Sequence, residues 1–121
     1  MITLHEKTFT CPIDVSLSFI NGKWKVLILG HLHRFQRSSF SNLREQMPGI
    51  SEKMLTQQLR DLEKDLLIEK HVLSAKPYRV EYTLTPLGQS LSPVTEFLSQ
   101  WGIRYLKDNG IDYLKDQHLY K

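Results

Sequence analysis

The sequence has little cysteine: Cys11 is the only one among 121 residues, so no intrachain disulfide can form. A chain without disulfides fits a reducing, cytoplasmic setting. Long hydrophobic runs are missing too. The first twelve residues hold no apolar core of signal-peptide length, and no segment approaches a membrane span. Repeats and low-complexity linkers are also absent from the sequence. These absences predict a cytoplasmic protein with no membrane partner.

The composition predicts one globular domain over residues 1–121. A chain of this length forms a single domain most naturally. Hydrophobic residues make up 40% and charged residues 24%, which is typical of a folded chain and excludes a disordered one. The formal net charge is +3 and the sequence pI is about 9.0. This mild basicity permits a nucleic-acid partner without establishing one.

Two N-terminal segments have the apolar spacing of helices. Residues 12–20 begin with Pro12, which suits a first helical position, and they end before Asn21 and Gly22. The apolar side chains of this segment fall on one face: Ile13, Leu17 and Ile20. The next segment, KWKVLILGHLH, has four apolar side chains that are expected to face a core: Trp24, Leu27, Ile28 and Leu32.

Residues 38–64 have the spacing of a helix-turn-helix. Ser38 and Ser39 can cap a short helix, whose apolar positions are Phe40, Leu43 and Met47. Pro48 and Gly49 must interrupt that helix, and Ser51 can cap the next one. Met54 stands where a glutamate or glutamine would complete a capping box, so Ser51 is expected to cap alone. Two helices joined by a turn of about four residues with Pro and Gly are typical of this motif.

The helix that follows Ser51 has two opposite faces. Its leucines form a core seam at helical spacing: Leu55, Leu59 and Leu62. A polar row lies on nearly the opposite side, with Thr56 at its edge: Lys53, Gln57, Arg60 and Lys64. Such rows are ordinarily solvated surface. As the second helix of a helix-turn-helix, however, this one would enter the major groove of DNA. Gln57 could then pair with adenine, Arg60 with guanine, and Lys53 with a phosphate.

The period then changes to that of a β-hairpin. Val80, Tyr82 and Leu84 alternate with polar residues, as in a half-buried strand. The segment EKHVL can pair with this strand, and residues 74–78 would connect the two. Lys76 and Arg79 would lie near the tip, where they could reach phosphates or the minor groove. The sequence thus predicts a mainly α fold with a small β-hairpin wing, a winged helix-turn-helix.

Thr85 and Pro86 read as the N-cap and first residue of a long helix, which Pro93 should bend and Asn109-Gly110 should end. A last short helix could follow. The segment 86–118 carries more apolar surface than one small domain can cover. Together with helix 12–20 it is the expected interface of a two-fold homodimer. The interface residues would be Ile13, Leu17, Ile20, Val94, Phe97, Leu98, Trp101 and Tyr105.

Four segments match a known family in order: CPIDVSLSFINGKWKVLIL, FSNLREQMPGISEKMLTQQLRDLEKD, RVEYTLTPLGQSL and FLSQWG. From Cys11 to Gly102 the chain resembles the HxlR-type winged-helix transcription regulators, which are related to the MarR-like regulators. The resemblance implies a homodimeric regulator that binds double-stranded DNA at an imperfect palindrome, with its reading helix at 51–64 and its wing at 74–79. Two positions depart from the family pattern: Leu66 replaces a frequent glycine, and Tyr78 replaces a frequent wing proline.

The expected DNA-binding residues come from the reading helix and the wing. They are Ser51, Lys53, Thr56, Gln57, Arg60, Lys64, Lys76 and Arg79. No cofactor is expected. No metal site is expected either, because His31 and His33 diverge on a helix and lack a cysteine or carboxylate cluster.

Cys11 is the candidate redox sensor. It precedes Pro12, so it should lie at the N-cap of the first helix, where unpaired N–H groups and the helix dipole favour a thiolate. By the resemblance, some family members sense oxidants or electrophiles at this cysteine, so the inducer would be a reactive small molecule. The alternative is a buried, inert thiol.

Two other function classes remain open. One is an enzyme with Cys11 as nucleophile, for which no Cys-His signature provides a base. The other is a winged-helix protein-interaction module that does not bind DNA.

Overall fold

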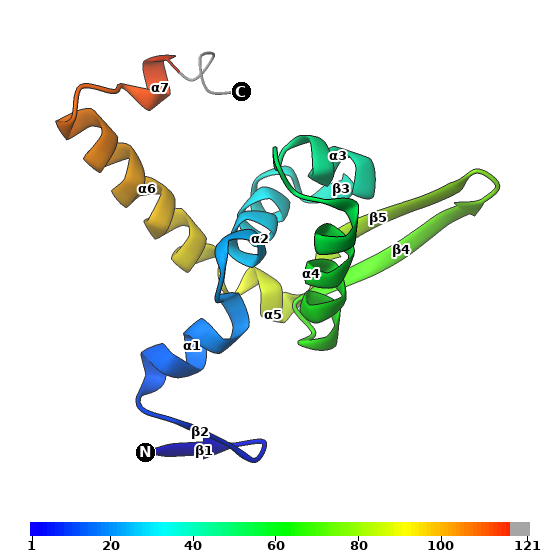
Figure 1. The fold of residues 1–121 in the computed structure, drawn as a ribbon, viewed down its shortest axis with the longest axis horizontal. Coiled ribbons are helices and arrows are strands. Elements are labelled where there is room, and N and C mark those ends of the chain that lie inside the picture. The colour runs from blue at the N-terminus through cyan, green and yellow to red at the C-terminus, as the bar shows by residue number, and fades with distance from the viewer. Residues whose placement is uncertain (117–121) are drawn as a thin grey trace.

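The computed structural model describes residues 1–116, and helix α2 (Lys23–Phe35) lies at its centre (Figure 1). Helix α2 packs against α4, α6, β3 and β5. The other elements follow in chain order: β1 (Ile2–Leu4), β2 (Lys7–Phe9), α1 (Pro12–Ile20), β3 (Arg37–Ser39), α3 (Phe40–Glu45), α4 (Glu52–Lys64), β4 (Ile68–Ala75), β5 (Tyr78–Leu84), α5 (Pro86–Gln89), α6 (Ser92–Asp108) and α7 (Tyr113–Asp116). The predicted winged helix-turn-helix is confirmed, with α3 and α4 as the motif and β4–β5 as the wing.

The core forms where the leucine seam of α4 meets α2. The seam residues are almost fully buried, as predicted: Leu55, Leu59 and Leu62. They share one apolar cluster with Ile28, Leu29 and Leu32 of α2. The prediction for Leu27 was wrong, because this side chain is 45% exposed. Successive helical residues are rotated by about 100°, so Leu27 lies nearly opposite the centre of the buried face that Ile28, Leu29 and Leu32 form.

The wing belongs to a three-stranded antiparallel sheet of order β3-β5-β4. Val80 and Tyr82 are buried, which confirms the predicted alternation. Strand β3 was not predicted, because three residues carry too little periodicity to be recognised. The predicted connection 74–78 was too long: β4 runs to Ala75 and β5 begins at Tyr78, so only Lys76 and Pro77 make the turn.

Helix α4 ends in a left-handed residue, Leu66, whose φ is +61°. The amide of Leu66 donates to the carbonyl of Glu63 at 3.0 Å, and that of Leu67 donates to Leu62 at 3.0 Å. This pair of bonds is a Schellman motif, in which glycine is the usual left-handed residue. The departure seen at Leu66 in the sequence therefore falls at the position where glycine matters most.

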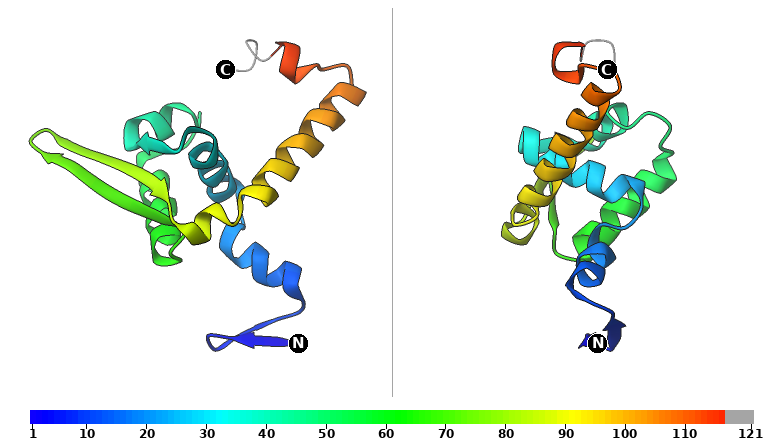
Figure 2. Two further views of the ribbon diagram at one scale, coloured as in Figure 1. Left: turned by 180° about the vertical axis from the view of Figure 1, so that it is seen from behind. Right: turned by 90° about the vertical axis from the view of Figure 1, so that its left-hand side faces the viewer.

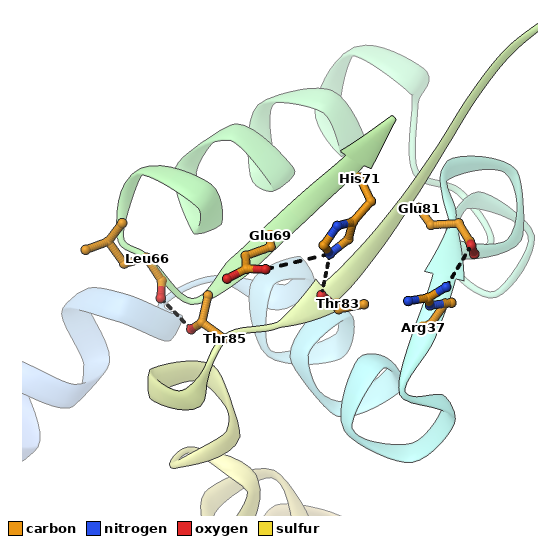
Figure 3. Close-up of polar contacts among 7 residues, drawn as sticks. All are labelled: Arg37, Leu66, Glu69, His71, Glu81, Thr83 and Thr85. Carbon is orange, nitrogen blue, oxygen red and sulfur yellow. Dashed lines mark hydrogen bonds and ion pairs between the residues drawn. The ribbon is translucent and has the colours of Figure 1, made fainter. Parts of the chain in front are cut away.

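The start of α5 is fastened to this helix end. The Thr85 hydroxyl donates to the carbonyl oxygen of Leu66 at 2.6 Å (Figure 3). It also accepts a bond from the amide of Gly88 at 3.0 Å, which confirms Thr85 as an N-cap. Gly88 itself touches Leu67 so closely that an added Cβ would lie 2.0 Å from the Leu67 carbonyl oxygen. Only glycine permits this approach, so the junction fixes where the wing leaves the body.

The single long helix expected from residue 86 was wrong. The chain forms the short helix α5, breaks at Ser90 and Leu91, and starts again as α6. Pro93 lies in the first turn of α6, where its missing N–H costs nothing, so it begins a helix and does not bend one. Helix α6 ends at Asp108, and the expected stop at Asn109 and Gly110 is confirmed. The expected short last helix is present as α7. The part of segment 86–118 beyond residue 116 lies outside the described residues.

Helices α1 and α6 diverge from the body on the side opposite the wing, and two views agree on this (Figures 1 and 2). A hairpin of β1 and β2, which was not predicted, precedes α1 in the chain and lies next to the N-terminal end of that helix. Within residues 1–116, no helix combines the length and the apolar character needed to cross a membrane.

Candidate DNA-binding surface

The polar row of α4 lies on the surface, opposite the buried leucine seam. Lys53, Gln57, Arg60 and Lys64 are all exposed, and Thr56 is half-buried at the edge of the row. We call the four exposed residues the outer stripe. Because the seam holds the opposite face of α4 in the core, the outer stripe is presented to solvent on a rigid element. It offers two lysines, an arginine and an amide, which can bind phosphates and base edges.

Ser51 sets the start of this helix. Its hydroxyl accepts a hydrogen bond from the amide of Met54 at 3.0 Å, and no glutamate or glutamine returns a bond. The expectation that Ser51 caps alone is confirmed. The cap fixes the first turn of α4 and therefore the position of Lys53.

The acidic residue Asp61 adjoins the outer stripe, and the sequence reasoning missed it. Asp61 accepts a hydrogen bond from Gln57 Nε2 at its Oδ1, over 2.9 Å. Its other oxygen, Oδ2, pairs with Lys25 Nζ of α2 at 3.6 Å. The spacing of four residues between Gln57 and Asp61 was visible in the sequence, but the Lys25 contact depends on how α2 packs against α4.

A cleft separates the helix-turn-helix from the wing. Its lining combines hydroxyls, two cations and two carboxylates, and comprises Ser39, Phe40, Ser41, Glu52, Thr56, Lys70, Leu73, Tyr78, Arg79, Val80, Glu81 and Tyr82. Two predicted residues therefore come together here, because Thr56 and Arg79 face the same cleft from α4 and β5. Lys76 is also exposed but lies at the turn of the wing, outside this lining.

Lys70 adds a cation that the sequence reasoning did not find. Its Nζ lies 5.8 Å from the centre of the Tyr78 ring. A hydrogen bond with the Tyr78 side chain raises the pKa of Lys70. Burial raises the pKa of Tyr82 beside it, which keeps that phenol neutral. No periodic signal marks Lys70 in the sequence, because its role depends on the wing folding beside α4.

Polar contacts link the two strands of the wing to each other and to β3 (Figure 3). Arg37 of β3 pairs with Glu81 of β5 at 3.7 Å. His71 Nε2 lies 2.8 Å from Thr83 Oγ1 across the β4–β5 ladder and 3.7 Å from Glu69. Exposed ion pairs of this kind contribute about 0–1 kcal/mol each. Their main effect here is to orient the base of the wing.

Cys11 lies at the N-cap of α1, as predicted, with extended backbone geometry (φ −163°, ψ 172°). Its side chain makes no capping hydrogen bond and is half-buried. The residue is therefore neither a fully buried thiol nor a freely exposed one.

Exposed apolar side chains gather on the two diverging helices. On α6 the set is Val94, Phe97, Leu98, Trp101 and Tyr105, and on α1 it is Ile13 and Leu17. The Trp101 and Tyr105 rings stack at 5.4 Å between centroids with an interplanar angle of 7°. Ile20 was assigned to the same surface, but it is half-buried and packs against the core. The last residue of α1 turns inward because the chain enters the body there.

Among the described residues, no group of three histidine, cysteine or acidic side chains could hold a metal ion. His31 and His33 lie on α2, where His31 packs against the Phe35 ring at 4.6 Å between centroids.

Both the sequence and the structure of the chain are similar to those of known proteins. A family model described as HxlR-like helix-turn-helix matches residues 19–110. The chain is 41% identical over 95 residues to the HTH-type transcriptional regulator YdeP of Bacillus subtilis (strain 168), covering 78% of this chain and 73% of that protein. The solved structure of the HTH-type regulator ytcD is similar with a TM-score of 0.74 and 40% identity, covering 81% of this chain and 99% of that one. The redox regulator HypR in its oxidized form is similar with a TM-score of 0.71 and 37% identity, covering 76% and 94%.

Proposed function

The chain belongs to the HxlR-like helix-turn-helix family of transcriptional regulators, and from this premise we propose that it binds an imperfect palindrome in duplex DNA as a homodimer. The outer stripe of α4 carries the proposal. Four polar side chains project from the face opposite a fully buried seam, on the second helix of a helix-turn-helix. That helix is the one that enters the major groove in this motif.

Each residue has a distinct role in the proposed complex. Arg60 forks to guanine and Gln57 pairs with adenine, because these side chains match the donor and acceptor pattern of those bases. Lys53, Lys64 and Ser51 contact phosphates at the two ends of α4. Thr56, Lys70 and Arg79 contact the same backbone from the two sides of the cleft. Lys76 contacts it from the turn of the wing.

The apolar surface of α1 and α6 supports the proposed homodimer. Trp101 is 61% exposed and Phe97 is 67% exposed, on a helix that projects away from the body. Exposed apolar patches of this kind mark interfaces. Pairing two copies through α1 and α6 leaves both outer stripes free, since these helices lie on the side opposite the wing. Two reading helices about one DNA turn apart (~34 Å) would then match a palindrome.

Selection from a random duplex pool tests this function. The parent protein should enrich one sequence with two inverted half-sites, bind it with strong salt dependence, and run as a dimer in solution. Equal recovery of all duplexes, at low and at high salt, would overturn sequence-specific binding, and failure to retain any duplex would overturn the proposal in favour of a protein-interaction module.

Regulation by oxidation at Cys11 is the finer part of the proposal. The support is its N-cap position and the similarity to HypR, a redox regulator. With one cysteine per chain, an oxidised Cys11 forms a disulfide with the sister Cys11 or with a small thiol. Because α1 lies in the proposed dimer interface, that bond would change the separation of the reading helices. The inducer would be a reactive small molecule.

Diamide, which converts two thiols into a disulfide, tests this step. Treating the operator complex should release DNA from the parent and not from Cys11→Ser. Release from both proteins, or from neither, would remove Cys11 from the signal and leave the DNA-binding proposal intact.

A further inference from the structure

Asp61 places a negative charge beside the outer stripe of α4, the surface proposed to bind DNA. It lies on α4 next to the outer stripe, and its side chain is 37% exposed. A carboxylate near DNA phosphates opposes binding, because like charges repel across a short distance. Its contacts give it a compensating role.

The two carboxylate oxygens of Asp61 face different partners. Oδ2 pairs with Lys25 Nζ at 3.6 Å, and the Lys25 side chain is only 13% exposed at the junction of α2 and α4. Oδ1 accepts the hydrogen bond from Gln57 Nε2 at 2.9 Å. Lys25 of α2 thus fixes the Asp61 carboxylate, and the carboxylate in turn fixes the Gln57 amide.

This arrangement fixes which way the Gln57 amide faces. A carboxylate is only an acceptor, so it selects the NH₂ end of the amide and rejects the carbonyl end. One N–H is then used by Asp61, while the second N–H and Oε1 stay available. That remaining donor–acceptor pair is what adenine requires, since it presents N7 and the N6 amino group in the major groove. An amide held in this orientation loses less rotational freedom on binding.

We propose that Asp61 is a positioning residue for base recognition, which is anchored by Lys25 and orients the Gln57 amide for adenine. Its negative charge lowers the affinity for all duplex DNA, while the oriented amide increases the preference for one sequence. This inference rests on the proposed DNA-reading function of α4. Removing the acceptor should therefore separate two quantities that usually fall together, affinity and specificity.

The experiment measures binding of the parent and its variants to the selected operator, to operators with each base pair replaced, and to unrelated duplex. The operator position read by Gln57 is the one where Gln57→Ala loses preference. At that position Asp61→Ala should lower the preference by about tenfold, while binding to unrelated duplex stays equal or becomes tighter. Asp61→Asn can present its own NH₂ group to Gln57, because Lys25 donates to the amide oxygen, so it no longer selects one end of the Gln57 amide and should lower the preference as Asp61→Ala does.

Two controls separate positioning from simple charge. Glu63→Ala removes an acidic residue from the side of α4 that faces Lys70 and Tyr82, so it should change affinity for all duplexes and leave the preference unchanged. In a Gln57→Ala background, Asp61→Ala should have no further effect on preference. Thermal unfolding reports the fold, and Asp61→Leu, which keeps bulk without an acceptor, replaces the alanine variant if that variant is unfolded.

The outcomes are distinct. If the parent selects an operator and Asp61→Ala keeps its base preference, or if its effect adds to that of Gln57→Ala, this inference is wrong and the proposed function stands. If the parent selects no sequence at all, the proposed function fails, and the positioning role fails with it.

Discussion

The Thr85 hydroxyl donates to the carbonyl oxygen of Leu66 at 2.6 Å, and this bond joins the end of the reading helix to the start of α5 (Figure 3). The Thr85 hydroxyl oxygen also accepts a hydrogen bond from the amide of Gly88 at 3.0 Å. One side chain thus satisfies the carbonyl after α4 and caps the helix that follows the wing. The orientation of α4 and the base of the wing depend on this junction.

Replacing Thr85 by alanine should destabilise the protein by about 1–2 kcal/mol, because an N-cap and a second hydrogen bond are lost together. Thr85→Ser keeps the hydroxyl and should lie close to the parent. Urea unfolding of the three proteins gives the comparison. Equal stability of the alanine and serine variants would show that the hydroxyl contributes nothing at this junction.

Leu66→Gly should stabilise the protein by about 1 kcal/mol. Leu66 has φ +61° and its side chain is 69% exposed, so glycine would remove backbone strain while little packing is lost. Leu66→Ala is the matched control, because alanine loses the same side chain but keeps the left-handed penalty. A stabilisation of the alanine variant equal to that of the glycine variant would refute the backbone explanation.

Trp101→Glu should convert the proposed dimer into a folded monomer. The side chain is exposed in the single chain, so a charge there costs little for folding, whereas a buried, unpaired charge in the dimer is expensive. Sedimentation measures the mass, and circular dichroism measures the helix content. Ser99→Glu adds the same charge to an exposed position on nearly the opposite face of α6 and should remain dimeric. A parent that is monomeric at micromolar concentration would contradict the assembly.

Stability should fall as the pH drops from 7.5 to 5.5, in part through His31. Burial lowers the pKa of His31, and the nearby Arg34 guanidinium lowers it further. The unfolded chain, with a pKa of roughly 6.5, therefore takes up a proton at a pH where the folded chain resists it. The contribution of the neutral imidazole is present above that pKa and is lost as pH falls. His31→Gln should show a shallower decline in urea unfolding, and parallel slopes would exclude His31.

The sequence predicted the elements whose side chains repeat at a regular spacing. The leucine seam of α4 and the alternation of Val80 and Tyr82 are both strong periodic signals, and both were confirmed. The caps Ser51 and Thr85 were also predictable, since a capping hydroxyl acts on amides only a few residues away.

The missed features depend on contacts between distant segments. Leu91 and Val94 continue the spacing of Leu87, so the sequence could not show that the chain breaks at Ser90 and begins α6 anew. Strand β3 exists because β5 pairs with it, not because residues 37–39 favour a strand. In the candidate site, the outer stripe was predicted from one helix alone. Lys70 and the Lys25–Asp61 pair were missed because each needs two elements to meet.

The central claim is that the outer stripe of α4 reads DNA sequence, and the salt-dependent binding of Arg60→Ala to the selected operator and to its single-base variants tests it most directly. Arg60→Ala should lose about 1–3 kcal/mol of specific binding and become indifferent to the base at one position in each half-site. Lys76 lies at the wing tip, and Lys76→Ala should instead weaken binding to the operator and to unrelated duplex alike and reduce the salt dependence of binding. An Arg60→Ala protein that binds the operator as tightly as the parent, with unchanged base preference, would contradict the account.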